Sequence, residues 1–396
     1  MKIAINGVGI AGPTLAYWLR KYGHEPVLFE KAPKLRTAGY VIDFWGSGYD
    51  IAEKMGLFPE LLEDAYIMER IRTLTASGRT TSSLNVRNFQ EMTNGRYMSI
   101  VRSDLSKHLF RACDGVETRF GTSVTGFEDQ GSKVKLQLSD NSSEDFDLLI
   151  GADGLHSHVR ELTFGAQETF EEHLGFYVAA FTLPGYQPRN ELTYLSHTVP
   201  GRQVSRISLR DDQTLFLFFF SKNFVNQQPE NEAGEKAVLR EIFADMGWET
   251  AAILSRMDEV NNIYFDRVSQ IKMPNWTKGR VALLGDAAAC ASLLSGEGTG
   301  LAMTEAYVLA GELKRANGNY EAAFSAYQNR LHGYLLQKQA MALKFAGFFA
   351  PKTWLGLFLR DAMTNFASVP VLGKLILGGM FKDNLKLPSY EDEQKN

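Results

Sequence analysis

The sequence predicts an α/β protein with a discontinuous Rossmann-like domain, an inserted and mostly antiparallel β-sheet, and helices at the C-terminal end. The chain starts as a β-α-β unit: the strand "KIAIN" (2–6), a glycine-rich turn, an apolar helical pattern and the strand "PVLFE" (26–30). Strands of similar texture return in "FDLLIGADG" (146–154) and "GRVALLGD" (279–286). Between them, from about residue 164 to 272, β-branched and aromatic runs alternate with turn residues, which is typical of antiparallel sheets.

The remaining elements follow from local patterns. Strands are predicted for "RIRTLTA" (70–76), "YMSIVR" (97–102) and "KVKLQLS" (133–139). Helices are predicted for "SDLSKHLFRAC" (103–113), which opens with a capping serine, and for "TGLAMTEAYVLAGELKRA" (299–316). We therefore expect a first domain over 1–70, 100–165 and 275–335, a second over 71–99 and 166–274, and a C-terminal helical segment over 336–396.

Composition narrows the class of protein. At 396 residues, with 44% hydrophobic and 22% charged residues, the chain is an ordinary globular protein too long for one small core. A formal net charge of −4 argues against nucleic-acid binding. The two cysteines, Cys113 and Cys290, lie in no Cys/His cluster, so we expect no disulfide framework, no metal site and a reducing, cytoplasmic location.

Membrane insertion is not expected. "MKIAING" predicts a strand rather than a signal peptide, and no uncharged apolar run is long enough to span a bilayer. The most apolar region, 341–381, is interrupted by lysine, arginine and aspartate. It predicts packed amphipathic helices and leaves peripheral membrane contact open. Either a monomer or a homodimer fits the sequence.

The N-terminal turn "GVGIAG" carries the G-x-G-x-x-G spacing, with glycines at 7, 9 and 12 and Ala11 between the last two. Gly7 permits the tight turn, Gly9 lets the backbone approach a pyrophosphate, and Gly12 lets the helix pack on the strand. Glu30 ends the next strand, where it would accept hydrogen bonds from a ribose, and Lys31 follows it. A glycine turn without a ligand is the alternative, but the strand, turn, helix and acid stand in the expected order. Since Glu30 would repel a 2′-phosphate, the AMP half of FAD or NAD is favoured over that of NADP.

Two later motifs repeat the theme. "DLLIGADGLHSHVR" brings Asp153 to the end of a strand with Arg160 behind it, and "RVALLGDAAACASLLSGEGTG" does the same for Asp286, followed by glycines at 296, 298 and 300. A helix-capping role is the alternative for Asp286 taken alone. In this order the three motifs resemble the single-component FAD-dependent aromatic hydroxylases, the para-hydroxybenzoate hydroxylase-like family that includes tetracycline-degrading monooxygenases. The resemblance spans about residues 2–332.

The resemblance implies roles for particular residues. Asp286 would bind a ribityl hydroxyl of FAD, and the N–H groups near Gly298 and Thr299 would face the pyrimidine end of the flavin. Further positions match family contacts to FAD or to the pyridine nucleotide: Arg36, Asp43, Arg102, Val124, Asp153 and Arg160. A solvated surface charge is the alternative for Arg36, and a turn aspartate for Asp43.

The family chemistry is also implied. NADPH or NADH reduces FAD, O₂ then gives a flavin hydroperoxide, and one oxygen passes to a hydrophobic, aromatic or polycyclic small molecule. The sequence identifies no catalytic side chain. It departs from the family at Ala289, where histidine is usual, and at Ser292-Leu293, where prolines are common, which puts the usual substrate contact in doubt.

The substrate pocket is expected between the aromatic sheet and the flavin. Candidate pocket residues are Phe176, Tyr194, Arg206, Phe218 and Phe220. Half of such side chains should face away because strand side chains alternate, and a plain core role is the alternative for each phenylalanine. An FAD-dependent oxidase, reductase or halogenase, or a non-enzymatic flavin-binding redox sensor, remain as alternative functions.

Overall fold

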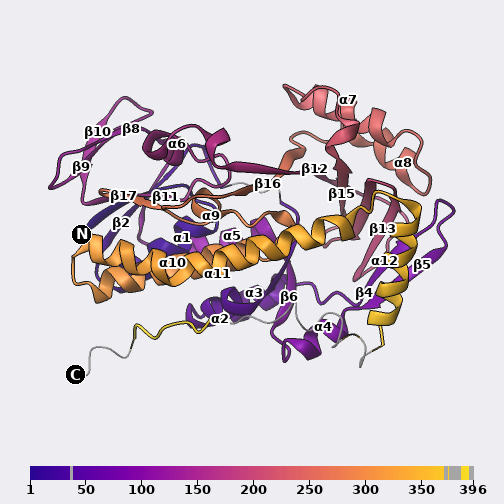
Figure 1. The fold of residues 1–396 in the computed structure, drawn as a ribbon, viewed down its shortest axis with the longest axis horizontal. Coiled ribbons are helices and arrows are strands. Elements are labelled where there is room, and N and C mark those ends of the chain that lie inside the picture. The colour runs from indigo at the N-terminus through magenta and orange to yellow at the C-terminus, as the bar shows by residue number, and fades with distance from the viewer. Residues whose placement is uncertain (36–38, 370–372, 374–384, 392–396) are drawn as a thin grey trace.

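The computed structural model describes residues 1–35, 39–369, 373 and 385–391, without the side chains of residues 345 and 346. Arg36 lies outside the described residues. Over the described residues the protein has a mixed α/β architecture, with four sheets and several long helices (Figure 1). The α/β class predicted from the sequence is therefore confirmed.

The six-stranded sheet carries all three glycine-containing motifs. Its strand order is β17-β18-β11-β1-β2-β7, and every neighbouring pair is parallel except β17–β18. The strands are β1 (Lys2–Asn6), β2 (Glu25–Glu30), β7 (Glu117–Phe120), β11 (Leu148–Gly151), β17 (Thr277–Lys278) and β18 (Val281–Leu283). Segments far apart in sequence thus become neighbours, and β18, β11 and β1 present their carboxyl ends at one edge.

The seven-stranded sheet is antiparallel except where β13 pairs with β4. Its order is β16-β12-β15-β14-β13-β4-β5. The strands are β4 (Arg70–Leu74), β5 (Thr80–Asn85), β12 (Glu171–Pro184), β13 (Thr193–Val199), β14 (Arg202–Ser208), β15 (Gln213–Ser221) and β16 (Tyr264–Ile271). Two smaller sheets are the pair β3 (Val41–Trp45) and β6 (Tyr97–Val101), and β8 (Val124–Asp129), β9 (Val134–Leu138) and β10 (Ser143–Phe146).

Helices connect and cover the sheets. The shorter ones are α1 (Ala11–Lys21), α2 (Gly46–Lys54), α3 (Phe58–Asp64), α4 (Arg87–Met92), α5 (Arg102–Arg111), α6 (His158–Phe164), α7 (Glu232–Phe243), α8 (Thr250–Ser255) and α9 (Asp286–Ala289). Three longer ones follow: α10 (Gly298–Arg315), α11 (Tyr320–Phe349) and α12 (Trp354–Ala367). In Figure 1, α11 runs from beside the six-stranded sheet to the seven-stranded one.

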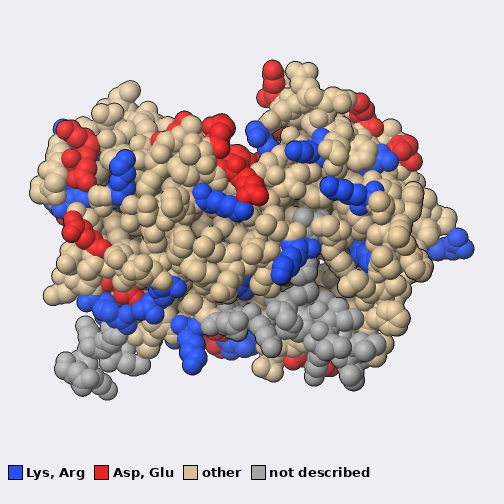
Figure 2. Space-filling view, in the orientation of Figure 1, with Lys and Arg blue, Asp and Glu red and all other residues tan. Residues whose placement is uncertain are grey.

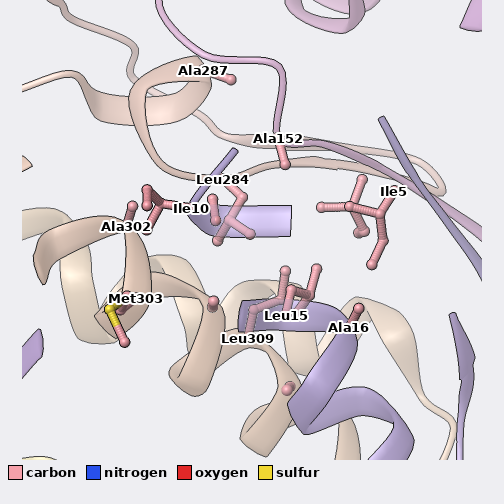
Figure 3. Close-up of a cluster of buried hydrophobic side chains, with 14 of the residues drawn as sticks. Ile5, Ile10, Leu15, Ala16, Ala152, Leu284, Ala287, Ala302, Met303 and Leu309 are labelled. Carbon is pink, nitrogen blue, oxygen red and sulfur yellow. The ribbon is translucent and has the colours of Figure 1, made fainter. Parts of the chain in front are cut away.

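The main core lies between β1, α1 and α10. Ile5, Leu15, Met303 and Leu309 are fully buried there, and Figure 3 shows them as part of one cluster of hydrophobic side chains. Burying a large aliphatic side chain stabilises a fold by about 1.5–3 kcal/mol, so this cluster fixes the register of α1 and α10 on the sheet. The starts of both helices are thereby held at the carboxyl edge.

Three features differ from the sequence-based expectations. Helices α7 and α8 lie within the region predicted as antiparallel sheet, because their short polar patterns are weak beside the neighbouring aromatic strands. The three-stranded β8–β10 sheet was predicted only at β9. Helix α11 also crosses the boundary expected at residue 336 without a break.

Within the described ranges, no helix is long and apolar enough to cross a membrane. Lysine, arginine, aspartate and glutamate are intermingled on the face shown in Figure 2, which matches the small net charge. Helix α12 leaves several large apolar side chains exposed, among them Trp354, Leu355 and Phe358.

Candidate functional site

The first part of the site is the tight turn between β1 and α1. Gly7 has φ of +118°, and a Cβ there would lie 2.4 Å from the Ala152 carbonyl oxygen. A Cβ on Gly12 would lie 2.0 Å from the Gly7 carbonyl oxygen. Both positions therefore exclude any side chain. A Cβ on Gly9 would meet only the Arg102 guanidinium, at 3.8 Å, among the described residues, so the Gly9 backbone borders open space.

Glu30 braces this turn from the end of β2. Its carboxylate accepts hydrogen bonds from the Val8 N–H and the Ala32 N–H, each at 3.0 Å. Carboxylate oxygens keep further lone pairs, so a ribose hydroxyl could still donate to Glu30. Lys31 is exposed beside it, and Ala11 is buried at the start of α1.

Asp153 binds the protein rather than projecting freely from β11. It accepts from Ser157 Oγ at 2.5 Å, from Asn6 Nδ2 at 3.1 Å and from two backbone N–H groups at the start of α6. Asn6 in turn accepts from the Val124 N–H at 3.1 Å. These hydrogen bonds connect β1, β8 and α6. Asp153 and Val124 therefore help to fix the positions of these elements at the carboxyl edge of the six-stranded sheet.

Arg160 is also directed into the protein. Its fully buried guanidinium donates to the carbonyl oxygens of Ala287 at 3.1 Å and Leu155 at 2.7 Å. Burial lowers the pKa of Arg160 from its usual range. The side chain therefore holds α9 in place from behind, rather than facing the open side of the sheet edge.

Asp286 follows a tight turn at Gly285. Gly285 has φ of +63°, and its N–H donates to Glu305 Oε2 at 2.8 Å. The Tyr327 hydroxyl donates to the same oxygen at 3.1 Å. Burial raises the pKa of Glu305 to about 8, and desolvation also raises the pKa of Asp286, partly opposed by Arg102.

Four residues from four segments converge at this edge. A Cβ on Gly298 would lie 4.0 Å from Asp286 Oδ1, which brings the start of α10 beside the carboxylate. Arg102, the first residue of α5, lies near Gly9 and acts electrostatically on Asp286. Thr299 belongs to the same first turn of α10, whose backbone N–H groups carry partial positive charge.

Two tyrosines, Tyr40 and Tyr264, lie near enough to this edge to interact electrostatically with Arg102 and Asp286. Tyr264 is 39% exposed, yet desolvation raises its pKa well above the usual range, and its ring centroid lies 5.6 Å from that of Tyr40. Asp43 is exposed to solvent, yet the surrounding protein raises its pKa. Asp43 Oδ1 accepts from the Tyr97 hydroxyl at 2.6 Å and from Ser99 Oγ at 2.8 Å.

The five candidate pocket residues divide between the two faces of the large sheet. Phe218 and Phe220 pack against Phe243 of α7, and Arg206 pairs with Glu249 at 2.7 Å beside α8. These three lie on the face away from α11, because strand side chains alternate. We correct the expectation that they line the pocket.

Phe176 and Tyr194 lie on the other face. Phe176 is 4% exposed and packs in a cluster with Leu294 and Ala342, so it belongs to the core between the sheet and α11. Tyr194 is half-buried and donates to Ser205 Oγ at 2.7 Å. Desolvation raises its pKa, while Arg360 lowers it and Asp43 raises it. Tyr194 therefore lies on the Asp43 side of the sheet.

Several supporting residues escaped the sequence analysis. Asn6, Glu305 and the Tyr97–Ser99 pair act through contacts between distant segments, which no local pattern encodes. Only Glu305 could have been noticed in the sequence, because it is an acidic residue within an otherwise apolar stretch of a buried helix. Ala289 is buried in the main core, and both cysteines are buried free thiols. In the described part of the chain, no group of three or more His, Cys, Asp or Glu side chains could hold a metal ion.

Comparison with known proteins gives consistent matches over the whole chain. The FAD binding domain family matches residues 1–326. A flavin-dependent monooxygenase of Legionella longbeachae is 35% identical over 397 residues, covering 99% of this chain and 98% of its own length. An FAD-dependent monooxygenase of Sarocladium schorii, asL4, is 31% identical over 80% of this chain and 76% of its own.

Solved structures agree. The tetracycline destructase Tet(51) superposes with a TM-score of 0.84 and 32% identity, covering 98% of this chain and 99% of its own. Klebsiella pneumoniae HpxO complexed with FAD and uric acid gives a TM-score of 0.80 at 22% identity over 96% of both chains, which shows a shared fold.

Proposed function

Since this chain belongs to the family of flavin-dependent monooxygenases, we propose that it uses NADPH or NADH and O₂ to oxygenate a hydrophobic aromatic or polycyclic small molecule. The chain is an FAD-dependent monooxygenase. The choice of pyridine nucleotide, the class of substrate and the residues that bind FAD belong to the proposal. The names of the relatives favour this reading over an oxidase, a halogenase or a redox sensor.

The observation that carries the proposal is the convergence of Gly9, Arg102, Asp286 and Gly298 at the carboxyl ends of parallel strands. Open α/β sheets bind ligands at this edge. The four residues come from segments spread over most of the chain, and each offers what one part of a flavin dinucleotide needs. If these residues served only to stabilise the fold, glycine would not be required at two of the four positions, Gly9 and Gly298.

The residues present fit FAD. Gly7 and Gly12 leave no room for a side chain, whereas the backbones of Gly9 and Gly296 border open space among the described residues, as a close approach by a cofactor requires. FAD, when bound, would supply electron transfer from the nicotinamide and the activation of O₂.

Each group of the site has a physical task in this proposal. The N-terminus of α1 and the Arg102 guanidinium would hold the pyrophosphate. Asp286 would accept from a ribityl hydroxyl, and the first N–H groups of α10, at Gly298 and Thr299, would stabilise negative charge at the pyrimidine end. Glu30 would bind the ribose of the adenosine half. Val124, Asp153 and Arg160 support this frame through the backbone contacts described above.

The large sheet would provide the substrate side of the cleft. Tyr194 and the Asp43–Tyr97–Ser99 cluster offer polar contacts within a largely aromatic enclosure, which suits a polycyclic molecule carrying hydroxyl groups. In this proposal the six-stranded sheet and its helices form a discontinuous FAD domain, and the seven-stranded sheet forms the inserted substrate domain. The proposal also places the protein in the cytoplasm, as a monomer or homodimer. Any peripheral membrane contact would be made by the exposed face of α12.

The proposal is tested with the FAD-loaded protein and tetracycline as a polycyclic probe. We expect tetracycline to stimulate NADPH oxidation and to gain the mass of oxygen. Asp286→Ala should lose bound FAD, while Glu321→Gln, an exposed change on α11, should retain it. Wild-type protein that binds no FAD would refute the proposal.

A further inference from the structure

A buried ion pair joins α11 to the start of α10. Lys338 Nζ lies 2.5 Å from Glu297 Oε2, and the side chains are only 6% and 11% exposed. The ammonium also lies 5.3 Å from the ring centroids of Trp45 and Tyr334. Cations over aromatic faces are stabilised by the ring quadrupole, so this site is built to hold a positive charge.

The position of Glu297 makes the pair relevant to the flavin. Glu297 directly precedes α10, whose first residues are Gly298 and Thr299, and its side chain makes no capping hydrogen bond to the helix. A carboxylate at a helix N-terminus offsets the partial positive charge of the helix dipole there. The carboxylate of Glu297 therefore places negative charge where the reduced ring also becomes negative.

Neighbouring contacts fix α11 against the same segment. Gln339 Nε2 donates to the carbonyl oxygens of Ile271 at 2.7 Å and Cys290 at 3.1 Å. Gln270 Nε2 donates back to the Gln339 carbonyl oxygen at 2.8 Å. Helix α11 therefore contacts the stretch from Asp286 to Glu297 at Cys290 and at Glu297, which gives Lys338 a defined position.

We propose that Lys338 is a positioning residue for the flavin: it neutralises Glu297, so that the N-terminus of α10 keeps its positive potential toward the reduced ring. This inference rests on the proposed function, which places the pyrimidine end at Gly298 and Thr299. It assigns a role in setting the reduction potential of FAD to a helix that carries no cofactor motif.

The sign of the shift in reduction potential distinguishes this role from a purely structural one. Lys338→Met removes the positive charge beside Glu297, so FAD should bind relatively less tightly when reduced, and the midpoint potential should fall. Glu297→Gln leaves Lys338 unpaired, and the potential should rise. The double variant removes both charges and should return close to the wild-type value. Lys344→Met, an exposed change on the same helix, should have no effect.

The test is the midpoint potential of FAD-loaded protein, measured anaerobically by equilibration with reference dyes, together with the Kd for oxidised FAD. We expect opposite shifts of about 30 mV for the two single variants, which is a tenfold change in relative affinity for a two-electron couple. Shifts in the same direction, or none, would overturn the inference while leaving the proposed function intact. Wild-type protein without FAD would instead refute the proposed function itself. If Lys338→Met folds poorly, Glu297→Gln and the double variant still give the sign.

Discussion

Replacing Glu305 with glutamine should change how the stability of the protein depends on pH. Glu305 is 1% exposed, and burial raises its pKa from 4.5 to about 8. A carboxyl with a raised folded-state pKa binds its proton more tightly when folded. Its contribution to stability is therefore fully present below pH 4.5 and is lost as the pH rises through about 8.

The size of the effect follows from the shift. Each pKa unit corresponds to about 1.4 kcal/mol, so ionising Glu305 costs the folded state about 5 kcal/mol in all, and about 2–3 kcal/mol of this falls between pH 6 and 9. Glutamine resembles the protonated acid, since its carbonyl oxygen can still accept from the Gly285 N–H and the Tyr327 hydroxyl.

Urea unfolding of the FAD-free protein, followed by tryptophan fluorescence at pH 6 and pH 9, measures this directly. Glu305→Gln should exceed the wild type by about 2 kcal/mol at pH 6 and by about 5 kcal/mol at pH 9, so that its advantage grows by about 2–3 kcal/mol between the two pH values. Glu321→Gln, at an exposed position of α11, should follow the wild type at both pH values. Parallel behaviour of wild type and Glu305→Gln would refute the reasoning.

Further predictions concern the cleft and the large sheet. Gly9→Ala should fold normally but bind FAD at least tenfold more weakly in a fluorescence titration. Gly12→Ala should instead lose about 1–3 kcal/mol or more of stability, because its Cβ meets the Gly7 carbonyl. Equal effects of the two substitutions would contradict the assigned geometry. Arg102→Met should weaken FAD binding about tenfold or more and reduce its salt dependence, and an unchanged Kd would remove Arg102 from the site. Phe218→Ala should cost about 3–5 kcal/mol on denaturation without altering substrate preference, while Tyr194→Phe should raise the KM for substrate with little loss of stability; the reverse pattern would place the pocket on the other face of the sheet.

The sequence predicted the parts of this fold that local patterns encode. Gly7, Gly12 and the strands that end near Asp153 and Asp286 were recognised because backbone geometry and apolar runs leave direct traces in sequence. The adjacency of β1, β11 and β18 was not predicted, because the order of strands in a sheet depends on contacts between distant segments. Helices such as α7 were missed, since their short amphipathic pattern was outweighed by the aromatic strands around them.

The inward or outward direction of side chains was less predictable. Phe176 and Phe218 look equivalent in sequence, yet one packs toward α11 and the other toward α7. Asp153 and Arg160 bear charges typical of a ligand site, but their hydrogen bonds bind strand ends and helices together. The pairing of Lys338 with Glu297 depends on how α11 lies across the fold, and neither residue belongs to a motif.

The central claim is that the protein uses FAD to transfer oxygen from O₂ to an organic molecule. The most direct test is mass spectrometry of the product formed from the same polycyclic probe by the FAD-loaded protein with NADPH under ¹⁸O₂. The account predicts one ¹⁸O atom per product molecule and NADPH consumed in equal amount. NADPH consumption with all of the labelled oxygen recovered as hydrogen peroxide, and an unlabelled probe, would contradict it.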